Sequence, residues 1–318
     1  MDPHLFAADI EARPSALGDL QRVLVTEDPW AEVPDDVGQV LLLGMGSSLF
    51  AASVAAARLR AQGVDAVAEL ASSELLPPPD TEQLVVAISA SGGSRETLDA
   101  VAQYAGQSPL MALTNTPVSP LAQAADATVL MHAGEETGGV SCRSYTHTQA
   151  LLLSLEERLT GADRDLLGLF GRVIEASDDL LQRRDEWLPT TVERLAGPDV
   201  TAVAAPFRRF GNAQQSALML REGPLRSALA SETGEWSHVD VYLTKTLDYR
   251  MLLLTGSRYE DQLLQWTRAR NSIVVAVGAE VDGAVSSVRY RNDDVEEVRL
   301  LTEVMVAELV AANLWSQQ

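Results

Sequence analysis

The stretch Val85-Val86-Ala87-Ile88-Ser89-Ala90-Ser91-Gly92-Gly93-Ser94-Arg95-Glu96-Thr97 decides the fold that we expect for this chain. It begins with a short apolar run bounded by turn residues, which predicts a buried strand. A loop rich in serine and glycine follows, and a helix starts near Glu96. Glycine lets the backbone approach a ligand closely, and the N–H groups at a helix start favour an anion. By itself the stretch predicts either an anion site or an ordinary turn of small polar residues.

Two further stretches repeat this pattern. Val40-Leu41-Leu42-Leu43-Gly44-Met45-Gly46-Ser47-Ser48 is again a strand with a Gly/Ser turn, and an apolar helix follows it. It lacks the third glycine of the dinucleotide-binding fingerprint. Gly138-Gly139-Val140-Ser141-Cys142-Arg143-Ser144-Tyr145 is a third hydroxyl-rich turn that enters a helix. Three such turns predict one shared pocket for a phosphate and sugar hydroxyls.

Composition restricts the class of protein. The chain has 318 residues, of which 46% are apolar, enough for two domains or one large α/β unit. No window approaches about eighteen uninterrupted apolar residues, and no signal pattern is present, so we expect a soluble cytoplasmic protein without a membrane partner. The net charge of −21 disfavours nucleic acid as a partner. Any phosphate must therefore be bound by local hydrogen bonds and helix ends.

Cysteine and lysine are each present once. Because Cys142 is the only cysteine, no internal disulfide or cysteine-based metal cluster is expected. A catalytic thiol at Cys142 is conceivable, but the sequence fixes no base beside it. Lys245 is the only lysine.

Strands and helices alternate along the first half, which predicts a parallel sheet with ligands at the carboxyl ends of its strands. We expect strands at Val40–Leu43, Ala66–Leu70, Leu84–Ile88, Leu110–Thr114 and Ala127–Met131, and helices near Leu49–Ala61, Glu96–Ala105 and Tyr145–Leu159. An amphipathic helix, kinked or broken at Pro14, is expected from about Pro3 to Val25.

The alternation resumes in the second half. We expect strands at Val200–Ala205, Met251–Leu254 and Ser272–Val277, and helices at Gln214–Glu222, Tyr259–Arg270 and Glu296–Leu314. The predicted fold class is α/β, with two doubly wound, mainly parallel subdomains in tandem. The predicted domains are a helical lead-in (1–35), a first α/β domain (36–160), a helical connector (161–197) and a second α/β domain (198–318).

With these motifs the chain resembles the SIS (sugar isomerase) family, and most of all the isomerase half of glucosamine-6-phosphate synthase and its deglycase-type relatives. The resemblance covers roughly residues 3 to 315 and is weaker in the second half. It implies a phosphate cradle formed by the Gly46-Ser47-Ser48 turn with Ser89, Ser91 and Ser94. It also implies a sugar contact at Ser141. The family usually has Gln where this chain has Ala90, which removes one side-chain contact.

The same resemblance implies catalytic roles for Glu222 and His238, which keep the family's spacing within Leu220-Arg221-Glu222 and Gly234-Glu235-Trp236-Ser237-His238. The glutamate would move a proton between C1 and C2, and the histidine would assist ring opening. From the residues alone, a solvated glutamate and an ordinary loop histidine remain the alternatives.

Several departures from the family bear on mechanism. Met219 and Ser237 stand where the family has lysines, and the C-terminal segment lacks the family's tail lysine. A Schiff base through a protein amine is therefore unsupported unless Lys245 supplies it. We also expect no glutaminase domain, and hence no synthesis of glucosamine 6-phosphate from glutamine by this chain alone.

The sequence thus predicts a homodimeric phosphosugar enzyme of the isomerase, deaminase or deglycase type. No metal or organic cofactor is expected, because the substrate's own carbonyl stabilises the enediol. The alternative is a non-catalytic sensor of sugar phosphates.

Overall fold

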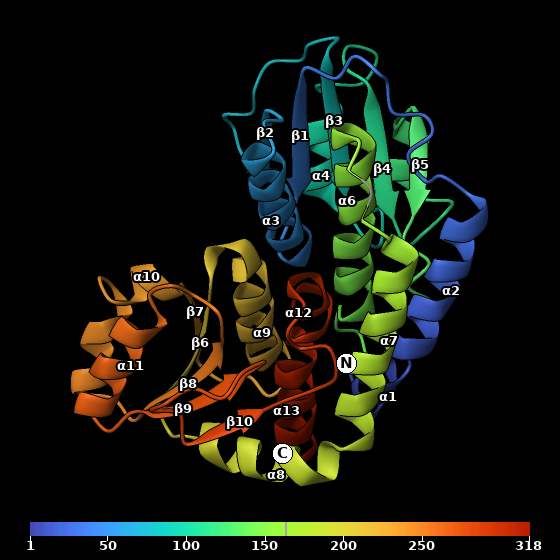
Figure 1. The fold of residues 1–318 in the computed structure, drawn as a ribbon. Helices are drawn as coiled ribbons and strands as arrows, with labels where there is room; N and C mark the ends of the chain where they lie inside the picture. Colours follow the sequence, from blue (N-terminus) through green and yellow to red (C-terminus); the bar gives the residue numbers. More distant parts are fainter. Residues whose placement is uncertain (163) are drawn as a thin grey trace. The chain divides into compact units, whose positions relative to one another are not determined.

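The structure is a computed structural model that describes residues 1–162 and 164–318. The chain divides into two compact units, which are treated separately below (Figure 1). The first-sheet unit consists of Ala16–Glu135 and Arg143–Phe170. The second-sheet unit consists of Met1–Ser15, Glu136–Cys142 and Gly171–Gln318. The domain limits expected from the sequence stay a prediction, and Asp163 in the expected connector lies outside the described residues.

The first-sheet unit contains a parallel sheet of five strands in the order β2-β1-β3-β4-β5. The strands are β1 Gln39–Gly44, β2 Ala66–Leu70, β3 Gln83–Ile88, β4 Leu110–Thr114 and β5 Ala127–Leu130. The accompanying helices are α2 Arg13–Thr26, α3 Ser47–Ala61, α4 Arg95–Val101, α5 Pro120–Ala124 and α6 Arg143–Thr160. All five strands expected from the sequence are present, with ends that differ by at most one residue.

Both faces of this sheet are covered, as a parallel sheet requires. Alternate residues of one face, including Leu41, Val85 and Ala112, form a buried cluster with residues of α4 and α5. On the other face, α3 packs against β1 and β2 and also contacts α6 (Figure 1). Burial on both faces explains why the strands are continuous apolar runs rather than alternating ones.

The second-sheet unit repeats this plan. Its five parallel strands lie in the order β10-β9-β8-β6-β7, which is the order of the first sheet with β6 in the place of β1. The strands are β6 Val200–Ala205, β7 Ala228–Glu232, β8 Tyr249–Leu254, β9 Ile273–Val277 and β10 Ser286–Val288. The sequence predicted β6, β8 and β9 but not β7 and β10, which are the two edge strands.

The helical elements that follow β6 in this unit are η1 Phe207–Arg209, α9 Phe210–Glu222, α10 Thr233–Trp236, η2 Asp240–Lys245, α11 Glu260–Ala269, α12 Glu296–Thr302 and α13 Val304–Ser316. One face of the sheet packs against α10, α11 and η2 through a cluster that includes Trp236 and Leu263. On the other face, α9 contacts β6 and β7, and α8 (Arg184–Leu195) contacts β8 and β9. Helix α13 in turn packs on α9, α8 and α1 (Pro3–Glu11) (Figure 1).

Three expected helices are each divided in two. The lead-in consists of α1 Pro3–Glu11 and α2, which begins just before Pro14, because the proline ring would clash with the carbonyl four residues earlier. The expected connector consists of α7 Leu166–Gln182 and α8 Arg184–Leu195. The expected closing helix is broken at Glu303 into α12 and α13.

A fully buried ion pair ties the start of the chain to its last helix. The Arg13 guanidinium donates to the Glu308 carboxylate, and neither side chain is exposed. Burial raises the pKa of Glu308, and Arg13 opposes that rise. Such a pair fixes the packing of α13 against the lead-in, because separating it would leave a buried charge without compensation.

Gly92 fixes the shape of the loop between β3 and α4. Its φ of +62° lies in the left-handed region, and a Cβ there would sit 2.2 Å from the Ser119 Oγ. Its N–H donates to the Ser89 carbonyl, and its carbonyl accepts from the Leu121 N–H. Only glycine satisfies both the backbone conformation and the space.

Across residues 1–162 and 164–318, no helix combines the length and the apolar character that a membrane crossing requires.

We expect Gly92→Ala to lower the free energy of unfolding by about 2–4 kcal/mol, since left-handed strain and overpacking each contribute about 1–3 kcal/mol. The matched control is Gly93→Ala, because the nearest atom to a Cβ there is the Ser91 Oγ at 4.0 Å. Urea unfolding of both variants measures the difference. Equal stabilities for the two variants would contradict this account of the loop.

Candidate functional site

Two of the three Ser/Gly turns leave the first sheet side by side. Strands β1 and β3 are neighbours, and their last residues, Gly44 and Ile88, pair in register. The chain runs from β1 to β2 on one side, whereas β3 continues to β4 on the other. The order of the strands therefore reverses between β1 and β3, which is the point where open α/β sheets bind ligands.

The loop after β3 carries three of the predicted phosphate ligands. Ser89 is buried, Ser94 is half-buried and Ser91 is exposed. Ser94 is the N-cap of α4, where its Oγ accepts from the Thr97 N–H at 3.4 Å and donates to Glu96 at 3.0 Å. The Ser91 Oγ accepts a hydrogen bond from the Gly93 N–H at 3.3 Å. These hydroxyls thus lie at or just before the N-terminus of a helix.

The loop after β1 places Ser47 and Ser48 in the first turn of α3. Gly46 precedes this helix with a φ of +51°, and no side chain caps the helix. Gly44 must be glycine, since a Cβ would sit 2.8 Å from the Ser48 Cβ. The uncapped N–H groups of α3 and the cap of α4 therefore belong to the two loops that diverge from β1 and β3.

Sequence reasoning missed Thr97 and the loop after β4. The Thr97 Oγ is buried next to the Ser/Gly loop without a hydrogen-bond partner in the described part of the chain. The hydroxyls of Thr114 and Thr116 both donate to the Ala90 carbonyl, at 3.2 and 3.3 Å. These threonines fix the Ser/Gly loop from the neighbouring strand. The sequence signal that could have identified them is a threonine at or just after the end of a predicted strand, as at Thr114 and Thr116.

Ser141, Glu222 and His238 belong to the second-sheet unit, whereas the other predicted site residues belong to the first-sheet unit. Ser141 is half-buried, and its carbonyl accepts from the Gln215 Nε2 at 2.9 Å. The adjacent loop is fixed from α1, because the Gly138 N–H donates to the Asp9 carboxylate at 2.7 Å. The third turn is thus attached to α9 and α1.

Cys142 is unsuited to nucleophilic attack. Burial raises the pKa of its thiol well above the ordinary value, and Glu308 and Glu136 raise it further. A thiolate is the nucleophilic form of cysteine, so this thiol stays protonated near neutral pH.

Glu222 is the last residue of α9 and is half-buried. Burial raises the pKa of its carboxyl group, and the adjacent Arg221 opposes that rise. A carboxylate with a raised pKa is a stronger base, which suits removal of a proton next to a carbonyl.

His238 follows the short helix α10 and is exposed. Its backbone N–H donates to the Glu235 carbonyl at 2.8 Å. Glu222 ends α9, and His238 lies two residues after α10. Both helices pack against β7. Neither side chain makes a hydrogen bond to another of the described residues. Their proton-transfer roles stay a prediction.

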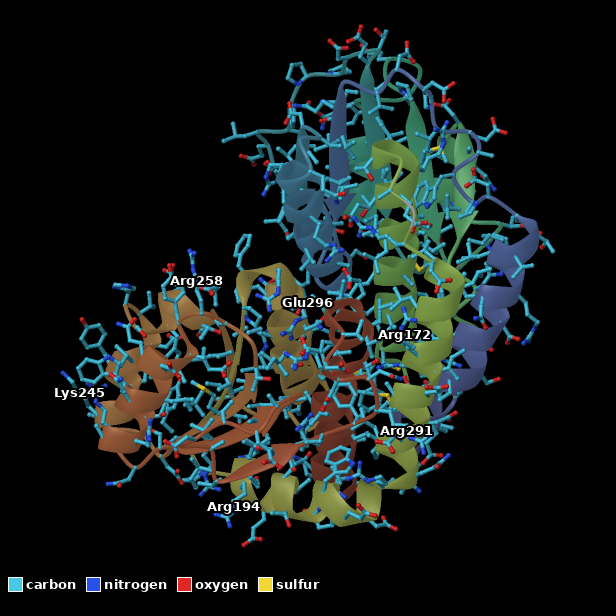
Figure 2. The ribbon with its side chains drawn as sticks, viewed as in Figure 1. Arg172, Arg194, Lys245, Arg258, Arg291 and Glu296 are labelled. Atoms are coloured by element: carbon cyan, nitrogen blue, oxygen red, sulfur yellow. The ribbon has the colours of Figure 1, made fainter. Side chains whose placement is uncertain are left out.

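Lys245, the only lysine of the sequence, ends η2 and is exposed at the outer edge of its unit (Figure 2). Its Nζ lies 5.3 Å from the centre of the Tyr242 ring. Met219, at a position where the family has lysine, is fully buried. Among residues 1–162 and 164–318, no group of three or more His, Cys, Asp or Glu side chains is arranged to bind a metal ion.

Known proteins share this fold and part of this sequence. Residues 36–156 match the model of the SIS domain. Glutamine–fructose-6-phosphate aminotransferase (isomerizing) of Pyrococcus horikoshii is 26% identical, over 98% of this chain and 54% of that protein. The corresponding enzyme of Aeropyrum pernix is 31% identical over 57% of this chain and 31% of its own length. This chain therefore spans about half or less of the length of these relatives.

Solved structures match over nearly the whole chain. The C-terminal domain of glucosamine-fructose-6-phosphate aminotransferase from Francisella tularensis has a TM-score of 0.83 and 18% identity, and the match covers 98% of this chain and 96% of that one. Glucosamine-6-phosphate deaminase from Thermotoga maritima has a TM-score of 0.75 and 17% identity, with coverage of 98% and 94%. The chain carries a SIS domain and is homologous to the isomerase domain of glucosamine-fructose-6-phosphate aminotransferase.

Proposed function

We propose that the chain is a phosphosugar-processing enzyme of the aldose–ketose isomerase, amino-sugar-phosphate deaminase or deglycase type. The observation that carries the proposal is the pair of Ser/Gly loops that leave neighbouring strands where the strand order reverses. The phosphate would accept hydrogen bonds from Ser48, Ser89, Ser91 and Ser94 and from the N–H groups at the starts of α3 and α4. Neutral donors of this kind suit a phosphate in a chain whose net charge is −21.

The chemistry needs one base and one acid. We assign the base to Glu222, which takes the proton from the carbon next to the carbonyl and returns it to the neighbouring carbon. We assign ring opening to His238, which passes a proton to the ring oxygen as the anomeric hydroxyl loses one. The substrate's own carbonyl group stabilises the enediol intermediate, so the proposal includes no cofactor. Ser141 would contact a sugar hydroxyl.

The phosphate cradle is tested by ligand binding. In a thermal-shift screen, fructose 6-phosphate, glucose 6-phosphate or glucosamine 6-phosphate is expected to raise the Tm of the protein. The unphosphorylated sugars should leave the Tm unchanged. Ser91→Ala is expected to raise the Kd at least about tenfold, since a hydrogen bond to a charged group contributes about 1.5–3 kcal/mol.

The control for that experiment is Thr81→Ala. Thr81 is an exposed residue that precedes β3, so it lies at the amino end of the strand, away from the Ser/Gly loops. Ser91 is preferred to Ser94 because Ser94 also caps α4, so its loss would change stability as well as binding. A similar rise of Tm with phosphorylated and unphosphorylated sugars would argue against a phosphate cradle.

Glu222→Gln separates catalysis from binding. We expect this variant to lose turnover by at least about 10²-fold, the contribution of general base catalysis, while its Kd for the sugar phosphate changes little. In the native protein, kcat/KM should fall on the acid side of its pH profile, because the base must be deprotonated. The midpoint of that fall should lie above pH 4.5, because burial raises the pKa of Glu222 from that value. Glu193→Gln, an exposed glutamate of α8, is the control.

A second candidate function is a non-catalytic sensor of sugar phosphates. Buried Met219 favours it, since this position offers no amine to the substrate. A sensor would bind the phosphorylated sugar without turnover in either the native protein or Glu222→Gln. Full turnover in Glu222→Gln would instead remove the role that we assign to this glutamate.

We also propose a homodimer that works in the cytoplasm. Exposed apolar side chains follow Glu222 and His238 in the second-sheet unit, and they include Leu225 at 78% exposure and Val239 at 54%. Light scattering should give twice the chain mass of 34.2 kDa. Leu225→Asn should weaken the dimer without unfolding the chain, because Leu225 has a φ of 53°, which asparagine tolerates. Leu75→Asn, at an exposed position of the first-sheet unit, should leave the mass unchanged. A monomer with full activity would contradict the proposal.

A further inference from the structure

The second sheet has its own reversal point, which the proposed function does not use. Strand β6 lies between β7 and β8, and the chain passes from β6 to β7 on one side and later enters β8 on the other. The loops after β6 and β8 therefore diverge from neighbouring strand ends, as the loops after β1 and β3 do in the first sheet. By the general rule for such sheets, this is a second place for a ligand.

Three guanidinium groups converge at this point on Gly256, the second residue after β8. A Cβ at Gly256 would lie 3.0 Å from a nitrogen of Arg299 and 3.2 Å from nitrogens of Arg208 and Arg209. The Arg208 Nη2 donates to the Gly256 carbonyl at 2.9 Å, and the Arg299 Nη2 donates to the Gly278 carbonyl at 2.9 Å. Where the first sheet presents serine hydroxyls, the second presents arginines.

One carboxylate oxygen lies between two of these guanidinium groups. The Glu296 Oε1 accepts from the Arg208 Nε at 2.6 Å and from the Arg209 Nε at 2.8 Å. Glu296 is the first residue of α12, and its side chain remains 28% exposed, so solvent reaches it (Figure 2). Burial raises the pKa of Glu296, but Arg209 and Arg208 outweigh that effect and lower it. Glu296 is thus ionised at neutral pH and bound as an anion.

The charges of the cluster balance when Glu296 is in place. Buried Glu303 also pairs with Arg209, and the Glu260 carboxylate accepts from the Gly256 N–H at 2.7 Å, so three carboxylates face the three guanidinium groups. Loss of Glu296 would therefore leave one guanidinium charge without a counter-charge. The Tyr290 hydroxyl is buried among the same charges without a hydrogen-bond partner in the described part of the chain. An external phosphate would then accept from the Arg208 and Arg209 donors that Glu296 releases.

We propose that the loops after β6 and β8 form an anion site for a phosphate group, and that the Glu296 carboxylate occupies it as an internal substitute ligand. Arg208 and Arg209 bind the anion, and Arg299 holds the loops after β8 and β9 in place. The site involves no residue of the first sheet, so it stands independently of the function proposed above. Removing the carboxylate opens the site to external phosphate.

The test counts bound phosphate in Glu296→Ala and in the native chain, by equilibrium dialysis against radiolabelled inorganic phosphate. We expect the variant to bind one more phosphate per chain than the native protein. Its Tm should fall in phosphate-free buffer and recover when phosphate is added, whereas sodium chloride of equal ionic strength should not restore it. Counting the difference between the two proteins removes any phosphate bound by the first sheet.

Two further variants make the result specific. Glu296→Ala combined with Arg208→Ala should lose the additional phosphate, and Arg208 is exposed enough to be replaced without opening the core. Asp294→Ala, which removes an exposed acid close by in the sequence, should bind as many phosphates as the native chain. If Glu296→Ala does not fold, the isosteric Glu296→Gln serves instead, since a neutral amide leaves both guanidinium groups without their shared charge.

An equal number of bound phosphates in the native chain and in a folded Glu296 variant would overturn the proposal. So would an additional phosphate that persists when Arg208 is also removed, because the site would then lie elsewhere.

Discussion

In both sheets all strands run in one direction, and the other features of the fold depend on this constraint. Parallel strands need crossover connections, which bring helices onto both faces and bury the central strands. Because the strands are parallel, every strand-to-helix loop lies at the carboxyl ends of the strands of its sheet. Residues that are far apart in the sequence, such as Ser48 and Ser89, therefore leave from adjacent strand ends. The candidate sites in this protein depend on strand order more than on any single motif.

The two sheets have the same strand order but present different chemistry at the point of reversal. The first offers hydroxyl groups and helix N-termini, which are neutral donors and need no counter-charge. The second offers three arginines, which would be costly to bury without anions. Glu296 and Glu303 supply those anions from α12 and the break before α13. The repeat is thus preserved in backbone and altered in charge.

Buried ion pairs also fix the last helix of the second-sheet unit. Arg13 pairs with Glu308 within α13, and Arg209 pairs with Glu303 immediately before it. Replacing one partner of such a pair leaves the other charge buried and uncompensated, which typically costs about 3–5 kcal/mol. These pairs therefore stabilise the observed position of α13. Together they connect α13 to the lead-in and to the end of β6.

The sequence by itself determined the strands of the first sheet, because each is an apolar run bounded by turn residues. It also located the Ser/Gly turns, since glycine and serine next to a strand end are a local signal. It did not predict β7 or β10, because edge strands such as Ala228–Glu232 are half-exposed and lack an apolar run. Nor did it predict the break at Glu303, whose carboxylate pairs with Arg209.

Only the tertiary structure brought Glu296 to Arg209, which is 87 residues away in the sequence. Charged residues at such a separation carry no periodic or local signal, and their meeting depends on how β6, β8 and α12 pack. The same holds for Thr97, whose burial beside the Ser/Gly loop depends on the packing of α4. Local sequence fixes which segments become strands and turns, whereas the packing of those segments decides which side chains share a site.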